Sequence, residues 1–331
     1  MTRLKFFLIA TCITFSLTIF TVPGVSFAGE VVLNWASFLP RSHPETVSLQ
    51  QALFDKINER GKGKLVIKYR GGPETFPARD IGDALGNGIV DIASALVTFY
   101  QAIVPGAAAS RLSPYLPAEE RKNGVYDYLD ALHQKYGIKY LGRPNPGRDT
   151  YFYTYLTKKV EKPEDFKGLR LGAAGSARPA VLAMGASVVT LKLSEYYSAM
   201  EKHLVDGITA VPPAAWVAWG CHEKTKFIPD HPYFQSTGML IMNLKSWNKL
   251  PKDLQDLIMN TMRKYEVERV PVEIAKAEKA DETMRKAGVQ FYKFSPEMAK
   301  WYHDKIYNSS WQDEEKRFGS VVTNFRKLMP H

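Results

Sequence analysis

The sequence predicts an α/β protein built as two lobes with a ligand cleft between them. The chain has 331 residues, long enough that a single core should split in two. Strands and helices alternate before residue 142 and again after residue 150. A proline-rich turn and an aromatic run separate the two sets, so the chain crosses between the lobes there. Lobes joined by several crossings form a hinge, and ligands bind near the carboxyl ends of the strands.

The first set of elements opens with VVLNWASF, an apolar run typical of a buried strand. Pro44 then begins a pattern with apolar residues on one helical face. β-Branched strands separated by helices favour a parallel sheet with crossover connections. The predicted strands are 31–38, 65–69, 90–96 and 138–141, and the predicted helices are 44–60, 78–85 and 118–136.

The second set follows a strong turn at Pro144-Asn-Pro-Gly147 and the β-prone run TYFYTYL. In this second set, glycines and other small residues again separate short apolar segments, and this pattern predicts a second α/β unit. The predicted strands are 150–156, 169–172, 188–191 and 205–211, and the predicted helices are 177–184 and 194–203.

A long helical pattern follows the buried strand predicted at 239–243. It begins after Pro251 and extends to residue 287, and Pro271 is expected to kink or break it. A short strand at 289–292 and helices from Pro296 onward complete the chain. We predict that lobe I contains 29–150 and 238–270, and that lobe II contains 151–237 and 271–331.

The N-terminus predicts a secretory signal peptide over residues 1–28, cleaved after Ala28, and hence a periplasmic protein. Arg3 and Lys5 precede an apolar run, and Ser26-Phe-Ala28 is a small-x-small exit. A membrane anchor is the alternative, but Thr and Ser interrupt the run over 6–22. A lipoprotein site at Cys12 is a weaker alternative because Thr11 fits it poorly.

The net charge of +10 raises the possibility of nucleic-acid, anionic-membrane or acidic-ligand partners. Lysine and arginine are scattered among acidic residues with no run of five like charges, so a mixed, solvated surface is favoured and nucleic acid is not expected. Cys221 is the single cysteine after residue 28, which excludes an internal disulfide in the mature chain.

Enzyme and cofactor motifs are absent from the sequence. No Gly-x-Ser-x-Gly elbow is present, and Gly86-Asn-Gly88 lacks the third glycine of a phosphate-binding loop. Cys221, His222 and Glu223 are adjacent, but neighbours on a helix point apart and cannot complete a zinc site. We therefore expect no catalysis, metal or cofactor.

Six segments in order resemble the solute receptors of tripartite ATP-independent periplasmic (TRAP) transporters, in the branch named for C4-dicarboxylate uptake. The resemblance covers nearly the whole mature chain and implies a type II-like periplasmic binding protein, with a long helix spanning both lobes. It also implies a non-catalytic, monomeric receptor that delivers a small organic ligand to membrane permease subunits. The segments are ASFLPRSHP at 36–44, IVDIA at 89–93, PEDFKGL at 163–169, LAMGA at 182–186, SEYYSAM with VDG at 194–207, and WNKLP at 247–251.

One departure from the family pattern concerns ligand recognition. Most members carry an arginine after the Gly-Leu-Lys-apolar strand, and its fork pairs with the ligand's carboxylate. That position is Gly172 here, and Ile208-Thr-Ala210 replaces the family's polar Gln-Glu-Asn. The ligand is therefore an atypical one, either not a standard carboxylate or held by other cations.

Three arginines are candidate replacements. Arg148 matches a second common arginine position of the family, Arg178 begins a predicted helix, and Arg41 lies in the first ligand loop. An ordinary surface position is the alternative for each of them, and the sequence does not choose among them.

Aromatic residues also fall in segments that line the ligand pocket in TRAP solute receptors. An aromatic lining suits an aromatic or apolar-tailed organic acid. A place in the core is the alternative for each. The predicted ligand contacts besides the arginines are Phe38, Thr98, Phe99, Gly172, Trp216 and Phe234. A periplasmic sensor or an enzyme on the same two-lobed frame is the alternative function.

Overall fold

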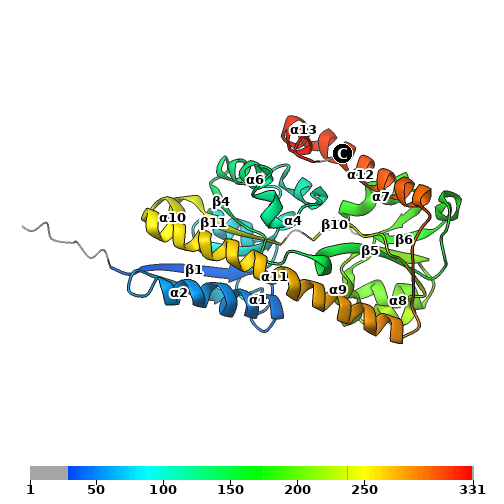
Figure 1. The fold of residues 1–331 in the computed structure, drawn as a ribbon, viewed down its shortest axis with the longest axis horizontal. Coiled ribbons are helices and arrows are strands. Elements are labelled where there is room, and N and C mark those ends of the chain that lie inside the picture. Colours follow the sequence, from blue (N-terminus) through cyan, green and yellow to red (C-terminus); the bar gives the residue numbers. More distant parts are fainter. Residues whose placement is uncertain (1–28, 174, 237, 330–331) are drawn as a thin grey trace, which may run out of the picture.

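The computed structural model describes residues 29–173, 175–236 and 238–329. Two β-sheets lie side by side along the long axis of the molecule, each flanked by helices (Figure 1). The predicted fold class, a two-lobed α/β protein, is confirmed. The predicted signal peptide and its cleavage site lie outside the described residues.

The sheet of lobe I has the order β2-β1-β3-β11-β4. β1 pairs in parallel with β2 and β3, as the sequence predicts, while β11 is antiparallel to both β3 and β4. β1, β2, β3 and β4 therefore all point the same way. The strands are β1 (Val31–Ser37), β2 (Leu65–Gly71), β3 (Ile92–Leu96), β4 (Ile138–Gly142) and β11 (Gly238–Asn243).

The sheet of lobe II has the order β12-β9-β5-β8-β6-β7, and β10 pairs with β5. β6 is parallel to β7 and β8, whereas β5 runs antiparallel to β8 and β9. The sequence did not predict β9 and β10. The strands are β5 (Tyr151–Leu156), β6 (Arg170–Ala173), β7 (Ser187–Val189), β8 (Gly207–Val211), β9 (Phe227–Pro229), β10 (Tyr233–Gln235) and β12 (Gln290–Tyr292).

Short helices cover both sheets. The helix predicted at 44–60 is observed as α1, a π-helical segment over Leu49–Phe54, and α2. The short helices are α1 (Pro44–Ser48), α2 (Asp55–Arg60), α3 (Ile81–Gly86), α4 (Val97–Tyr100), α5 (Pro117–Glu120), α6 (Val125–Gln134), α7 (Arg178–Ala183), α8 (Tyr196–Glu201), α9 (Pro213–Ala218) and α10 (Leu244–Asn248).

The long helix α11 (Lys252–Lys286) has 35 residues and runs along both lobes (Figure 1). It continues through Pro271, so the predicted break does not occur. Proline removes the hydrogen bond to the carbonyl four residues earlier, which belongs to Val267. Val267 is 58% exposed, so water can satisfy the freed carbonyl.

The C-terminal helices return from lobe II to lobe I. α12 (Pro296–Phe318) packs on α7, whereas in α13 (Ser320–Arg326) the carbonyl of Val321 accepts a 2.5 Å hydrogen bond from Tyr128 Oη in α6. The predicted lobe boundaries remain a proposal. They assign residues 271–331 to lobe II, whereas α13 lies against α6 of lobe I.

Candidate ligand site between the lobes

The carboxyl edges of the two sheets face each other. In lobe I the parallel strands end at this edge, and the segment 143–150 leads from the end of β4 to the start of β5. Because β5 is antiparallel to β8, its start lies beside the carboxyl ends of β8 and β6. This arrangement is where ligands bind in open α/β sheets.

A cavity of about 370 Å³ lies at this junction. That volume falls in the range of small-molecule sites. Both lobes, the crossing segment and α11 contribute to its wall. The lining residues are Leu116, Gly147, Arg148, Tyr151, Tyr153, Asp230, Pro232, Val270 and Ile274.

Arg148 supplies a cation to this cavity. Its Nη2 donates a 2.5 Å hydrogen bond to Asp281 Oδ2 of α11, and its guanidinium lies 5.8 Å from the centre of the Tyr153 ring. The side chain of Arg148 is 27% exposed. Arginine carries five N–H donors, so Asp281 can orient the guanidinium while its other N–H groups bind an anion.

Phe38, Thr98 and Phe99 lie together where β1 and β3 end. The rings of Phe38 and Phe99 meet edge to face with centres 5.9 Å apart, and both residues are half-buried. Thr98 is exposed beside them. The two rings form an aromatic surface on the lobe I edge, and contact of Phe38, Thr98 and Phe99 with a ligand stays a prediction.

Arg41 and Arg178 lie apart from the 370 Å³ cavity. The guanidinium of Arg41 lies 5.5 Å from the centre of the Tyr69 ring, and Arg41 lines a separate cavity of about 160 Å³ within lobe I. Arg178 is exposed on the first turn of α7. Arg148 is therefore the one among the three candidate arginines that borders the 370 Å³ cavity.

Gly172 leaves no space for a longer side chain. A Cβ atom placed there would lie 3.1 Å from Ile208 Cγ1 and 3.1 Å from Leu191 Cδ1, both carbon atoms of packed apolar side chains. An arginine at this position would have to displace them.

We predict that Gly172→Arg lowers the free energy of unfolding by about 1–3 kcal/mol, the usual cost of overpacking. Urea unfolding followed by circular dichroism measures this cost. Gly175→Arg is the matched control, because a Cβ at Gly175 meets no atom within 4 Å. Equal stability of the two variants would show that the apolar packing around Gly172 is not restrictive.

Trp216 and Phe234 differ from expectation, because both belong to the core. Trp216 is 0% exposed, stacks on Tyr155 with ring centres 4.2 Å apart, and donates a 2.9 Å hydrogen bond to Thr225 Oγ1. Phe234 is 1% exposed and packs edge to face on Tyr233. Neither ring presents surface to a ligand in this conformation.

Ala210 is a strained residue at the end of β8. Its φ of 67° lies in the left-handed region, which costs an alanine roughly 1–2 kcal/mol. Its N–H donates a 3.1 Å hydrogen bond to Tyr233 Oη, which holds this conformation. Strain of this kind often accompanies functional sites.

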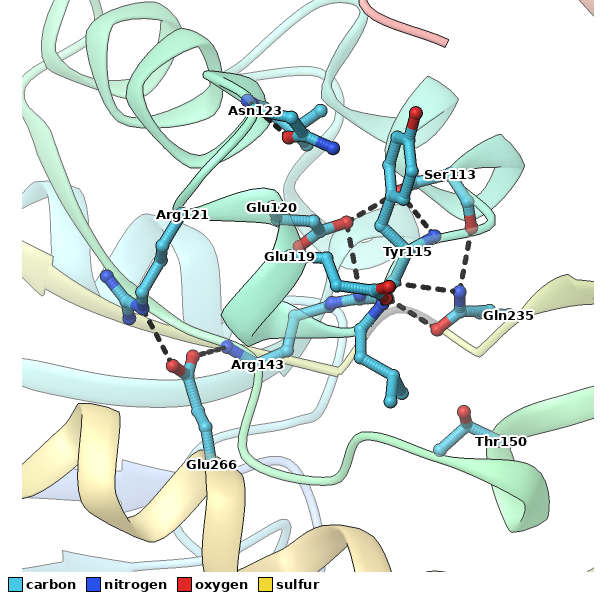
Figure 2. Close-up of polar contacts among 12 residues, drawn as sticks. Ser113, Tyr115, Glu119, Glu120, Arg121, Asn123, Arg143, Thr150, Gln235 and Glu266 are labelled. Carbon is cyan, nitrogen blue, oxygen red and sulfur yellow. Dashed lines mark hydrogen bonds and ion pairs between the residues drawn. The ribbon is translucent and has the colours of Figure 1, made fainter. Parts of the chain in front are cut away.

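A buried polar network joins the crossing segments (Figure 2). Arg143, just after β4, donates 2.6 Å hydrogen bonds to Gln235 Oε1 at the end of β10 and to the carbonyl of Tyr115. It also forms an ion pair with Glu120 (3.0 Å), and its backbone N–H donates to Glu266 Oε1 of α11 (3.0 Å). This network fixes two crossings and the long helix relative to each other.

The charged groups of the network are almost fully buried. Arg143, Glu120 and Glu266 are each 2% exposed. Burial raises the pKa of Glu120, with Arg143 opposing the shift, and burial likewise raises the pKa of Glu266, against the attraction of Arg121. Both Nη groups of Arg143 bond protein partners, so we assign it to the hinge, while its buried Nε has no partner among the described residues.

A family model described as bacterial extracellular solute-binding protein, family 7 (DctP), matches residues 35–314. The chain belongs to this family. The resemblance to TRAP solute receptors is thereby confirmed, and the members of this family are receptors rather than enzymes.

Solved TRAP periplasmic solute-binding proteins share the fold of this family 7 chain. One from Haemophilus influenzae, with bound L-gulonate, is 23% identical with a TM-score of 0.68, covering 90% of this chain and 99% of the other. One from Desulfovibrio salexigens, with bound orotic acid, is 19% identical with a TM-score of 0.70, covering 90% and 96%. One from Citrobacter koseri, with bound D-glucuronate, is 22% identical with a TM-score of 0.66, covering 90% and 100%.

Metal-ligand clusters and membrane-spanning helices are both lacking in the described part of this receptor. No group of three or more His, Cys, Asp or Glu side chains within it could hold a metal ion. None of the helices described there is long and apolar enough to cross a membrane.

Sequence reasoning missed several polar residues at the junction of this family 7 receptor. Arg269, Glu273 and Lys276 lie on one face of α11, a spacing of four and then three residues that the sequence displays. Their partners on other elements are far away in the sequence, so spacing alone could not reveal them. The missed residues are Glu45, Asn145, Asp149, Tyr151, Tyr153, Asp230, Arg269, Glu273 and Lys276.

Proposed function

We propose that this protein is an extracytoplasmic receptor that binds a small organic acid between its lobes and delivers it to the membrane permease of a TRAP transporter. The observation that carries the proposal is the 370 Å³ cavity at the lobe junction, bordered by the guanidinium of Arg148 and by two tyrosines. The guanidinium of Arg148 suits a carboxylate, and the other lining residues, apart from the acidic Asp230, are apolar or aromatic and suit a larger organic body.

The relatives support the class of ligand. The three solved receptors described above hold gulonate, orotic acid and glucuronate. Gly172 gives this chain no arginine at the expected position, so we propose that Arg148 replaces it. The ligand is then an atypical acid, a class that includes aromatic acids. The receptor acts as a monomer in the periplasm after cleavage behind Ala28.

The lobes supply the mechanism of delivery. Contacts that a ligand makes to both lobes only in the closed state shift the population towards closure, and the permease recognises the closed form. The crossing segment 143–150 and α11 form the hinge. A sensor on the same frame would close in the same way but would act without a permease.

We expect Arg148→Ala to weaken binding of the organic acid by about 1.5–3 kcal/mol, roughly 10- to 150-fold, because a hydrogen-bonded charge is lost. A thermal-shift screen of organic acids, amino acids and aromatic acids first identifies the ligand. Isothermal titration calorimetry then compares the dissociation constants of the wild type and the variant.

Arg263→Ala is the control for this experiment, because Arg263 is an exposed arginine of α11 that bonds Asn260 nearby on the helix. It should bind as the wild type does. An unchanged dissociation constant for Arg148→Ala would remove Arg148 from the site, and turnover of the bound acid would refute a receptor role.

A further inference from the structure

A second polar group lies at the lobe junction, built from four separate segments. Lys276 of α11 forms a 2.6 Å ion pair with Asp149 of the crossing segment. The other oxygen of Asp149 accepts a 2.9 Å hydrogen bond from the N–H of Ala214, in the first turn of α9. Asp149 thus connects the long helix to the carboxyl edge of lobe II.

Glu45 reaches the same group from lobe I. It lies at the start of α1, where its N–H bonds to His43 Nδ1. Its Oε1 lies 3.7 Å from the position that a Cβ on Gly238 would occupy, at the carboxyl edge of lobe I. Its carboxyl is near enough to α11 to interact electrostatically with Lys276 and Glu273.

Two buried oxygens in this group lack a hydrogen-bond partner within the part of the chain that the structure describes. They are Glu45 Oε1 and Asn145 Oδ1. The Asn145 amide hydrogen-bonds the Glu45 carboxyl, so Glu45 Oε1 and Asn145 Oδ1 are the two acceptors left over side by side. A buried unsatisfied acceptor costs roughly 1–3 kcal/mol, and native structures hold few of them.

The charges around these oxygens favour a donor over a second anion. The carboxyl groups of Glu45, Asp149 and Glu273 face two cations, Lys276 and Arg269. Each cation has a carboxylate partner, Lys276 in Asp149 and Arg269 in Glu273, while Arg269 Nε has no partner among the described residues. Burial raises the pKa of Glu45 to about 7, against the attraction of Lys276, so this carboxyl gains from any partner that donates to it.

We infer that Glu45 and Asn145 form a subsite that accepts hydrogen bonds from a hydroxyl or ammonium group of the ligand. The ligand is then a hydroxylated or amino-substituted organic acid, not an unsubstituted one. The inference rests on the proposed function, because it presumes that an organic acid enters the lobe junction.

Three acids with the same six-carbon chain test the inference. L-Gulonate carries hydroxyl groups, norleucine carries an ammonium group, and hexanoate carries neither. With the purified full chain, we expect gulonate or norleucine to raise the melting temperature and hexanoate to leave it unchanged at equal concentration. Calorimetry then gives the dissociation constant of each acid that binds.

Variants locate the subsite and distinguish its two possible donors. Glu45→Ala removes the acceptor and should weaken binding at least about tenfold, and Asn145→Ala should do the same. Glu45→Gln keeps a neutral acceptor, so it should retain a hydroxyl ligand and lose an ammonium ligand. Glu59→Gln is the matched control, because Glu59 is exposed on α2 of the same lobe.

The two proposals fail in different ways. Hexanoate binding as tightly as the substituted acids, or unchanged affinities in both Glu45→Ala and Asn145→Ala, would overturn the subsite and leave the receptor function standing. If no organic acid in the wider screen raises the melting temperature of the wild type, the proposed function fails, and the subsite fails with it.

Discussion

Arg143→Ala should lower the free energy of unfolding by about 3–5 kcal/mol, because it leaves Glu120 buried without its cation. Arg143 and Glu120 are each 2% exposed, and the guanidinium also bonds Gln235 and the carbonyl of Tyr115 (Figure 2). For a chain of this size we expect the melting temperature to fall by roughly 10 °C. Thermal and urea unfolding followed by circular dichroism measure the change.

A surface ion pair provides the control. Lys64 and Asp253 are 3.0 Å apart, but their side chains are 69% and 58% exposed. Lys64→Ala should therefore change the free energy of unfolding by less than about 1 kcal/mol. A similarly small effect of Arg143→Ala would mean that the crossing segments are held by packing and not by this network.

The fold was largely readable from the sequence because its strands and helices carry strong periodic patterns. The parallel pairing of β1 with β2 and β3 followed from apolar strands separated by amphipathic helices. β9 and β10 were missed because prolines interrupt this stretch: Pro229 ends β9 and Pro232 precedes β10, a pattern typical of turns and not of strands. Pro271 misled the prediction because its effect depends on the exposure of Val267, which the sequence does not give.

The site was predicted less well than the fold. Arg148 was a candidate from its turn and from the family resemblance, and the structure places it on the cavity wall. Trp216 and Phe234 were indistinguishable from cleft residues in sequence, since an aromatic after a strand can face either the core or the edge. Glu45, Asn145 and Lys276 come from three distant segments, so only the folded chain brings them together.

Glu45→Gln should change the dependence of stability on pH. Burial raises the pKa of Glu45 from 4.5 to about 7 in the folded protein. Between these values the folded state holds the proton that the unfolded state has released, so the contribution of Glu45 to stability is full below about pH 4.5 and is lost as pH rises through 7. Since glutamine does not titrate, the variant should gain about 2–3 kcal/mol relative to the wild type between pH 4.5 and pH 8.

Neighbouring groups determine how this experiment is read. His43 lies on the same loop, Asp149 on the crossing segment, and Arg269, Glu273 and Lys276 on α11. Burial also raises the pKa of Asp149, and burial lowers that of His43, so the wild-type profile alone mixes several titrations.

The difference between Glu45→Gln and the wild type isolates Glu45, and Glu59→Gln should follow the wild type at every pH. A constant difference from pH 4.5 to pH 8 would mean that Glu45 is ionised at low pH and has donors enough beyond Asn145. That result would remove the physical basis for a ligand hydroxyl or ammonium at this position.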